Sequence, residues 1–293
     1  MEDSPLFQRA AVIGVGLIGG SLGWALRHHG LAGEVVGVEP DMATLERARQ
    51  RGLIDRGVTD PAAGVTGADL VVIAVPVGSF EAVLARAAAA IEPGALVTDV
   101  GSVKLSVQAE AERLLEGGPV FVGGHPIAGT EESGVEAALG DLFQGALCVV
   151  SVTEATPEWA VARLTTLWRA VGSQVVTMAP AEHDRVLAAT SHLPHILAFA
   201  LIQTFAALPE RDRLEKFAAG GFRDLTRIAA SDAVMWRDIA LANRDPLLAM
   251  LDDFENQLGM LRQAIEHADG GALEHYFGEA RMVRRGLSGR GKQ

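Results

Sequence analysis

The sequence predicts an α/β fold, in which a doubly wound and mostly parallel sheet is followed by an all-α domain. Between residues 10 and 178, short apolar runs alternate with segments of helical spacing. The first run leads directly into a glycine-rich turn and a helix. After Pro180 convincing strands disappear and long helical patterns continue to about residue 285. We therefore expect a sheet domain at residues 1–179 and a helical domain at residues 180–293, which ends in a flexible basic tail.

Seven apolar runs are expected to be the buried strands of this sheet. Continuous Val, Ile and Leu runs separated by helices are typical of parallel strands covered on both faces. The runs are AAVIGVG (10–16), EVVGVE (34–39), DLVVIAVPV (69–77), ALVTDVG (95–101), PVFVGG (119–124), ALCVVSV (146–152) and QVVTM (174–178). The later helices are so apolar that each must bury more than one face, against its neighbours or against a second copy of the chain.

Composition limits the kinds of binding partner and the cellular compartment that we expect for this chain. The 293 residues are 49% hydrophobic and carry a formal net charge of -12, which argues against nucleic acid because phosphates need clustered Lys and Arg. The basic C-terminal stretch is expected to be a solvated tail, with a binding arm as the alternative.

Cys148 is the only cysteine, which favours a reducing, cytoplasmic location. The N-terminus is unlike a signal peptide, and no apolar run reaches the roughly 18 residues that span a bilayer, so we expect no membrane partner.

The glycine-rich turn has the spacing of a dinucleotide site. Gly14, Gly16 and Gly19 form a GxGxxG pattern, with Leu17 and Ile18 between the last two glycines. Gly14 would permit the tight turn, Gly16 would let the backbone approach a pyrophosphate, and Gly19 would allow close packing of helix on strand. The alternative is a glycine-rich turn without a ligand.

Glu39 ends the second predicted strand, 20 residues after Gly19. A carboxylate at this place accepts hydrogen bonds from the adenosine ribose and would repel a 2′-phosphate. Pro40 and Asp41 supply no cation, so NAD is favoured over NADP.

The loops after the third and fourth strands should line the same crevice, because ligands bind at the carboxyl ends of parallel strands. Lys104 fits equally well as an ordinary surface lysine. The residues expected near the nicotinamide are Val75, Pro76, Asp99, Gly101, Ser102 and Lys104.

His125 falls by the same logic at the carboxyl end of the PVFVGG run. Oxidation of a carbinol by hydride transfer needs a base for the hydroxyl proton, and an imidazole with a pKa of ~6.5 suits that task. Activity should then rise with pH through one ionisation near neutrality. The alternative is a helix-capping or core histidine.

Two further clusters lie in the helical region. His192 and His195 share a helix face that Pro194 should bend or interrupt, and they suit a substrate pocket or a structural role. A metal is not expected, because no third ligand has suitable spacing. The second cluster is a polar stripe, which indicates either surface salt bridges or a binding site for an anionic substrate. Its residues are Arg223, Asp224, Arg227 and Ser231, with Trp236 following.

With these stretches in view, the sequence resembles the prephenate/arogenate (cyclohexadienyl) dehydrogenase family of tyrosine biosynthesis, over about residues 9–285. The resemblance rests on GVGLIGGSL, TDVGSVK, HPIAGTEESG, SHLPH and GGFRDLTRIAASDAVMWRDI, in that order. It implies NAD-dependent oxidative decarboxylation of prephenate to 4-hydroxyphenylpyruvate, of arogenate to tyrosine, or of both. It also implies a Rossmann-type domain and an all-helical domain that forms much of a homodimer interface.

The resemblance assigns roles to individual residues. It makes His125 the group that hydrogen-bonds the ring hydroxyl of the substrate, and Ser102 the residue that orients His125 and touches the same hydroxyl. Arg227 would bind the ring carboxylate. The remaining transfers are a substrate pocket lined by His192, His195, Ser231 and Trp236, and a gating polar network that includes Glu131 and Asp224.

The fused chorismate mutase and the regulatory domain of some family members are not expected in a chain of this length, so any tyrosine inhibition would act at the active site. Three rival readings remain. A 3-hydroxy acid dehydrogenase would oxidise without decarboxylation and would use a pair such as His125 and Glu131. An NAD-binding sensor would bind NAD but would need no base. A structural dimerisation protein would need neither NAD nor a base.

Overall fold

The computed structural model describes residues 4–130 and 132–288. The chain forms two compact units, which meet between Arg244 and Asp245. The domain boundary expected at residues 179 and 180 lies within the first unit, at the start of a helix, and stays a prediction.

The secondary structure alternates strands and helices up to residue 178 and is helical thereafter. The elements of the first part are β1 (Phe7–Ile13), α1 (Leu17–His28), β2 (Ala32–Val38), α2 (Met42–Gln50), β3 (Arg56–Val58), α3 (Pro61–Val65), β4 (Leu70–Ile73), α4 (Val77–Ala87), η1 (Ala88–Ala90), β5 (Leu96–Asp99), α5 (Leu105–Leu114), β6 (Val120–Phe121), β7 (Gly123–Ile127), η2 (Val135–Ala137), β8 (Leu147–Ser151), α6 (Glu158–Ala170) and β9 (Gln174–Met178). The later elements are α7 (Pro180–Leu187), η3 (Ala188–His192), α8 (Leu193–Ala206), α9 (Arg211–Leu214), η4 (Glu215–Phe217), α10 (Gly220–Thr226), η5 (Arg227–Ala230), α11 (Ala233–Ala242), α12 (Arg244–Glu266) and α13 (Gly270–Ser288).

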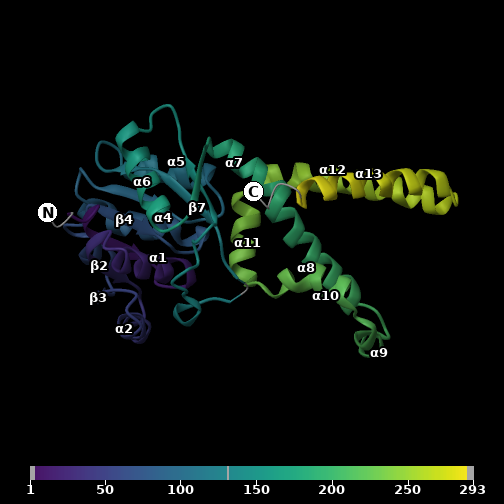
Figure 1. Cartoon of the computed structure of the whole chain (residues 1–293), viewed down its shortest axis with the longest axis horizontal. Coiled ribbons are helices and arrows are strands. Elements are labelled where there is room, and N and C mark those ends of the chain that lie inside the picture. Colours follow the sequence, from purple (N-terminus) through teal and green to yellow (C-terminus); the bar gives the residue numbers. More distant parts are fainter. Residues whose placement is uncertain (1–3, 131, 289–293) are drawn as a thin grey trace. The chain divides into compact units, whose positions relative to one another are not determined.

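The central sheet has six parallel strands in the order β3-β2-β1-β4-β5-β6, which confirms the predicted doubly wound α/β fold. Figure 1 labels β2, β3 and β4 of this sheet. The strand order reverses between β1 and β4, and the carboxyl ends of these two strands define the crevice of such a sheet. Alternate residues of β1 enter different cores. Ala10 and Val12 pack in the core that includes α1 and α6, whereas Ala11 and Ile13 pack in the core that includes α4 and α5.

Of the last three predicted strands, only the first half of PVFVGG, which forms β6, belongs to this sheet. The run PVFVGG splits at Val122, which is the last residue to donate a backbone hydrogen bond to β5, at Val97. Beyond it β7 pairs antiparallel with β8, and β8 pairs parallel with β9, to form a separate sheet. The expectation of one sheet is therefore wrong for β7, β8 and β9. His125 lies within β7 and not after the end of the preceding strand.

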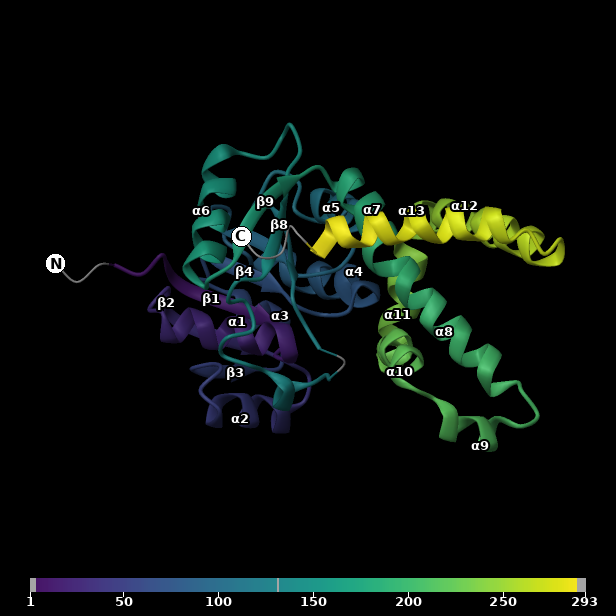
Figure 2. The same ribbon diagram turned by 45° about the vertical axis from the view of Figure 1, so that its right-hand side comes forward.

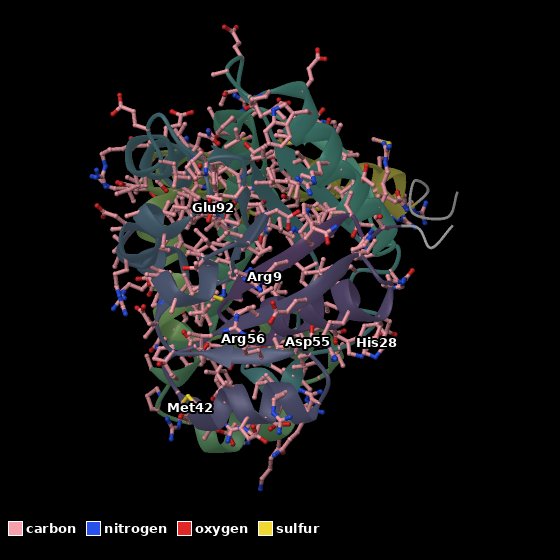
Figure 3. All side chains as sticks on the ribbon, turned by 90° about the vertical axis from the view of Figure 1, so that its left-hand side faces the viewer. Arg9, His28, Met42, Asp55, Arg56 and Glu92 are labelled. Atoms are coloured by element: carbon pink, nitrogen blue, oxygen red, sulfur yellow. The ribbon has the colours of Figure 1, made fainter. Side chains whose placement is uncertain are left out.

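The ends of the central sheet differ in chemistry. At the amino-terminal end, Glu34 on β2 pairs with Arg9 on β1 and with Arg56 on β3, at 2.6 and 3.3 Å. Figure 3, in which the left-hand side of Figure 1 faces the viewer, labels Arg9 and Arg56. The backbone at the carboxyl end instead carries the glycine-rich turn and the loops predicted to bind ligand.

Helices α7, η3 and α8 run on from one another over Pro180–Ala206. The turn before Pro194 widens to a π-helix, as expected where a proline removes a backbone donor and crowds the preceding turn. By length and composition this stretch is apolar enough to cross a membrane. The expectation that no run reaches that threshold is wrong, although a core helix passes the same test.

The second unit consists of α12 and α13, which lie side by side as a pair of long helices (Figure 2). Both helices keep large apolar side chains exposed. Among these side chains are Leu258, Met260, Ile265, Phe277, Met282 and Val283.

Candidate active site

The glycine-rich turn has the geometry that its sequence predicts. Gly14 has φ +91°, and a Cβ added there would lie 2.4 Å from the carbonyl oxygen of Ala74. A Cβ on Gly19 would lie 1.9 Å from the carbonyl oxygen of Gly14, so the first turn of α1 packs directly on the loop. A Cβ on Gly16 would meet no protein atom within 4 Å. Two of the glycines are therefore required by the protein itself, and the third leaves open space beside the backbone.

A cavity of about 310 Å³ opens at the carboxyl ends of β1, β4 and β5. It brings together the glycine-rich turn, the loops after β4 and β5, and part of the His125 strand, as the sequence predicts. From the loops that follow β1, β4 and β5 and from the start of α1, its wall takes Gly16, Leu17, Ile18, Val75, Pro76, Gly101 and Ser102. From elsewhere in the chain it takes His125, Gly129, Thr130, Glu132, Ser133, Ser231, Met235 and Ile239.

Glu39 follows β2 and is half-buried beside the turn. Its Oε2 lies 3.4 Å from the backbone nitrogen of Val15, which donates. Burial raises the pKa of the Glu39 carboxyl, and this hydrogen bond opposes the shift. The carboxylate is thus held at the edge of the glycine-rich turn, where it could accept a hydrogen bond from a ribose hydroxyl.

His125 is the one buried ionisable group among the described residues of the cavity wall, and its side chain belongs to a hydrogen-bonded series. Its Nδ1 lies 2.8 Å from Nε2 of His183 on α7, and Nδ1 of His183 lies 2.8 Å from Oδ1 of Asp184. The backbone nitrogens of Lys104 and Leu105 donate to the same carboxylate at 2.7 and 2.9 Å, so Asp184 caps the amino-terminus of α5.

Lys104 neither lines the cavity nor lies on the surface, in contrast to both expectations for it. It is 1% exposed and forms an ion pair with the buried Asp99. Asp99 also accepts hydrogen bonds from the backbone nitrogens of Gly101, at 2.8 Å, and Gly124, at 3.1 Å. One carboxylate therefore joins the loop that carries Ser102 to the strand that carries His125.

The pKa of His125 is lowered well below its usual value, first by burial and then by the neighbouring His183 and Lys104. His125 is thus neutral at pH 7 and able to accept a proton. No hydrogen bond joins Ser102 to His125 in the described part of the chain, although both line the cavity. The side chain that engages Nδ1 of His125 is that of His183.

The two histidines of the SHLPH motif take different positions. His192 is fully buried behind the cavity wall, where Nδ2 of Asn243 donates to its Nδ1 at 2.8 Å. His195 is half-buried and stacks on Trp236, with ring centroids 3.7 Å apart. Nδ1 of His195 donates to the carbonyl of Ser191 at 2.9 Å, which leaves the lone pair of the neutral ring on Nε2.

The polar stripe is divided between two helical segments. Arg223 and Asp224 lie exposed on α10. Arg227, which begins η5, is also exposed and is not among the residues that line the cavity, but it lies close enough to His195 to lower the pKa of that ring in addition to the effect of burial. Ser231 reaches the cavity wall. Glu131 lies outside the described residues. Within the described ranges, no three His, Cys, Asp or Glu side chains are grouped so as to hold a metal ion.

Sequence reasoning missed three buried side chains, namely His183, Asp184 and Asn243. The only local signal is a His-Asp dipeptide that precedes the SHLPH motif on the same helical pattern. Asn243 donates to the carbonyl of Asp184 at 2.8 Å as well as to His192, and so ties the end of α11 to α7 and η3.

Comparison with known families gives two consecutive matches. The family described as "Prephenate dehydrogenase, nucleotide-binding domain" matches residues 22–177, and "Prephenate dehydrogenase, dimerization domain" matches residues 179–279. The chain is 38% identical to the prephenate dehydrogenase of Bacillus subtilis, over 94% of this chain and 74% of that protein. It is 36% identical to the cyclohexadienyl dehydrogenase of Zymomonas mobilis, over 96% of this chain and 97% of that protein.

Solved structures agree with this result. The prephenate dehydrogenase of A. aeolicus, crystallised with hydroxyphenyl propionate and NAD+, superposes with a TM-score of 0.88 at 37% identity, covering 96% of this chain and 98% of that one. The arogenate dehydrogenase of Synechocystis superposes with a TM-score of 0.81 at 30% identity, covering 96% of this chain and 100% of that one.

Proposed function

Since this chain belongs to the prephenate dehydrogenase family, we propose that its cavity binds a cyclohexadiene that bears a ring hydroxyl and a ring carboxylate. The chain is an NAD-dependent oxidoreductase that carries out the oxidative decarboxylation of prephenate, arogenate or both. The observation that carries the proposal for the site is the neutral imidazole of His125 on the wall of the cavity that the glycine-rich turn also lines.

The residues of the turn suit the cofactor. Gly16 leaves space for a pyrophosphate against the backbone, at the amino-terminus of α1, and Glu39 stands where the adenosine ribose would be bound. Leu17, Ile18, Val75, Pro76 and Gly101 would pack around the nicotinamide. When bound, NAD supplies the hydride acceptor.

His125 would hold the proton that leaves the substrate. We assign Nε2 of His125 as the acceptor for the proton of the ring hydroxyl, because Nδ1 of His125 already faces His183. Ser102 lies on the same wall and would bind the same hydroxyl. A positioned base contributes roughly 10²- to 10⁴-fold to such a reaction.

Arg227 would bind the ring carboxylate and fix the ring against the base. That carboxylate loses its charge when carbon dioxide departs, so tight binding of it would stabilise the ground state more than the transition state. His195, held flat by Trp236, and Ser231 would line the rest of the pocket, with Asp224 and Glu131 in a network that gates it and His192 supporting it from behind.

The helical part suits a homodimer. The exposed apolar side chains of α12 and α13, and the sparsely buried stretch Pro180–Ala206, need an apolar partner, which a second copy of the chain would supply. We further propose a cytoplasmic location, and that any inhibition by tyrosine acts by competition in the same cavity.

An absorbance assay of nicotinamide reduction tests the proposal, with prephenate and arogenate each offered NAD and NADP. We expect turnover with NAD, together with release of carbon dioxide in equal amount. Oxidation without carbon dioxide would favour a 3-hydroxy acid dehydrogenase. NAD binding without turnover of either substrate would favour a sensor.

A further inference from the structure

The chemistry proposed for His125 depends on which ring nitrogen carries its proton. A neutral imidazole is a base only at the nitrogen that lacks the proton, and the partner of the other nitrogen decides which one that is. Nδ1 of His125 is engaged by His183, whereas Nε2 has no hydrogen-bond partner among the described residues.

The donors and acceptors behind His125 limit the possible arrangements. The carboxylate of Asp184 only accepts, so Nδ1 of His183 must donate to it. If His183 is neutral, its Nε2 is an acceptor, and Nδ1 of His125 must then donate. If His183 is instead charged, Nδ1 of His125 accepts, and the proton of a neutral His125 moves to Nε2. The first pattern makes His125 a base on the cavity side, and the second makes it a donor.

The surroundings favour the first pattern. His183 is fully buried, and the ammonium of the nearby buried Lys104, whose backbone nitrogen donates to Asp184, is already matched by Asp99. Asp184 is held by the backbone nitrogens of Lys104 and Leu105 at the amino-terminus of α5, which satisfies its charge without a second cation. A charged His183 would also face His125 once that ring took a proton, and two adjacent buried cations are strongly disfavoured.

We propose that His183 and Asp184 are positioning residues, which keep the proton of His125 on Nδ1 and leave the Nε2 lone pair facing the cavity. The inference rests on the proposed role of His125 and adds two residues that act through it. Its basis is the unbroken series from the amino-terminus of α5 through Asp184 and His183 to the ring of His125.

Nitrogen-15 NMR of the full-length protein labelled at histidine tests the tautomer directly, without turnover. The His125 signals are assigned by their loss in His125→Asn. At pH 7.5 we expect Nδ1 of His125 to be protonated and Nε2 to be bare. A protonated Nε2 would overturn the proposal. Failure of the wild-type protein to turn over either substrate would contradict the proposed function instead, and would leave this readout intact.

Two variants test the consequence for catalysis. His183→Leu removes the acceptor, and we expect kcat to fall by about 100-fold or more, with KM for the cyclohexadiene and Kd for NAD within roughly threefold of wild type. His183→Gln keeps an amide oxygen for Nδ1 of His125, and should recover kcat to within about tenfold. Equal kcat in both variants, whether both are high or both low, would overturn the proposal. His29→Leu, an exposed histidine on the surface, serves as the matched control.

Discussion

His195 and Trp236 stack face to face, with their ring planes 19° apart. The pair joins the start of α8 to α11, and the carbonyl of Ser191 fixes the remaining rotation of the imidazole. His195 therefore has one orientation, which its neighbour on α11 sets.

This relationship predicts the behaviour of Trp236→Leu. Loss of the flat partner should free the His195 ring and raise KM for the cyclohexadiene by roughly three- to tenfold, the size of an aromatic pair energy. KM for NAD should not change. Steady-state kinetics measure both constants. Trp159→Leu, at an exposed tryptophan, is the control and should leave both constants unchanged.

Arg227→Ala should act mainly on substrate affinity. Removal of a charge-assisted pair is expected to raise KM for the cyclohexadiene by about two orders of magnitude, with a smaller effect on kcat. Arg223→Ala is the matched control, since Arg223 lies exposed on α10. An unchanged KM in Arg227→Ala would remove this guanidinium from the site.

The pH dependence follows from the lowered pKa of His125. Only the neutral ring accepts a proton, so kcat/KM should be constant above neutrality and should fall as pH drops through that pKa, below 6.5. The sequence alone led us to expect the inflection near neutrality, and burial moves it to more acidic pH. An inflection above pH 7 would contradict an imidazole in this environment.

Gly16→Ala separates the needs of the ligand from those of the protein. The added methyl meets no protein atom within 4 Å, so the thermal midpoint without NAD should be unchanged. The increase in that midpoint when NAD is added should be largely lost, because the methyl occupies the space proposed for the pyrophosphate. Gly94→Ala, which is equally unobstructed, should respond to NAD as wild type does.

The burial of His192 leads us to predict how the unfolding free energy depends on pH. Burial lowers its pKa to about 4, so the folded state prefers the neutral ring. The shift corresponds to roughly 3 kcal/mol of unfolding free energy, fully present above pH 6.5 and lost as pH falls toward 4, with about 2 kcal/mol gone at pH 5. Denaturant unfolding at pH 7 and pH 5 should show a smaller loss in His192→Gln than in wild type. An equal loss in both proteins would show that His192 does not cause it.

The sheet and the cofactor turn could be predicted because their signals are local. A strand buried on both faces must be apolar throughout, and Gly14 and Gly19 sit where any side chain would collide with backbone. The apolar run at PVFVGG gave the existence of strands but not their partners. Its division at Val122 depends on Asp99, a residue of another strand, which accepts from Gly124 in place of a backbone carbonyl.

The positioning of His125 could not be predicted for a related reason. His183 is 58 residues away in the sequence, and its neighbour Asp184 serves a helix that begins near Lys104. Nothing in the spacing of these residues distinguishes a buried series from ordinary exposed charges on a helix. Lys104 shows the same limit, because an isolated lysine in a loop gives no sign of a buried carboxylate beside it.

The double attachment of Asp99 has a consequence for the precision of the site. Its two oxygens accept from Gly101 on one side and from Gly124 on the other, so both segments are attached to the same side chain. If Gly101 packs against the nicotinamide and His125 accepts the proton, as proposed, this one carboxylate would restrain both the hydride distance and the proton distance.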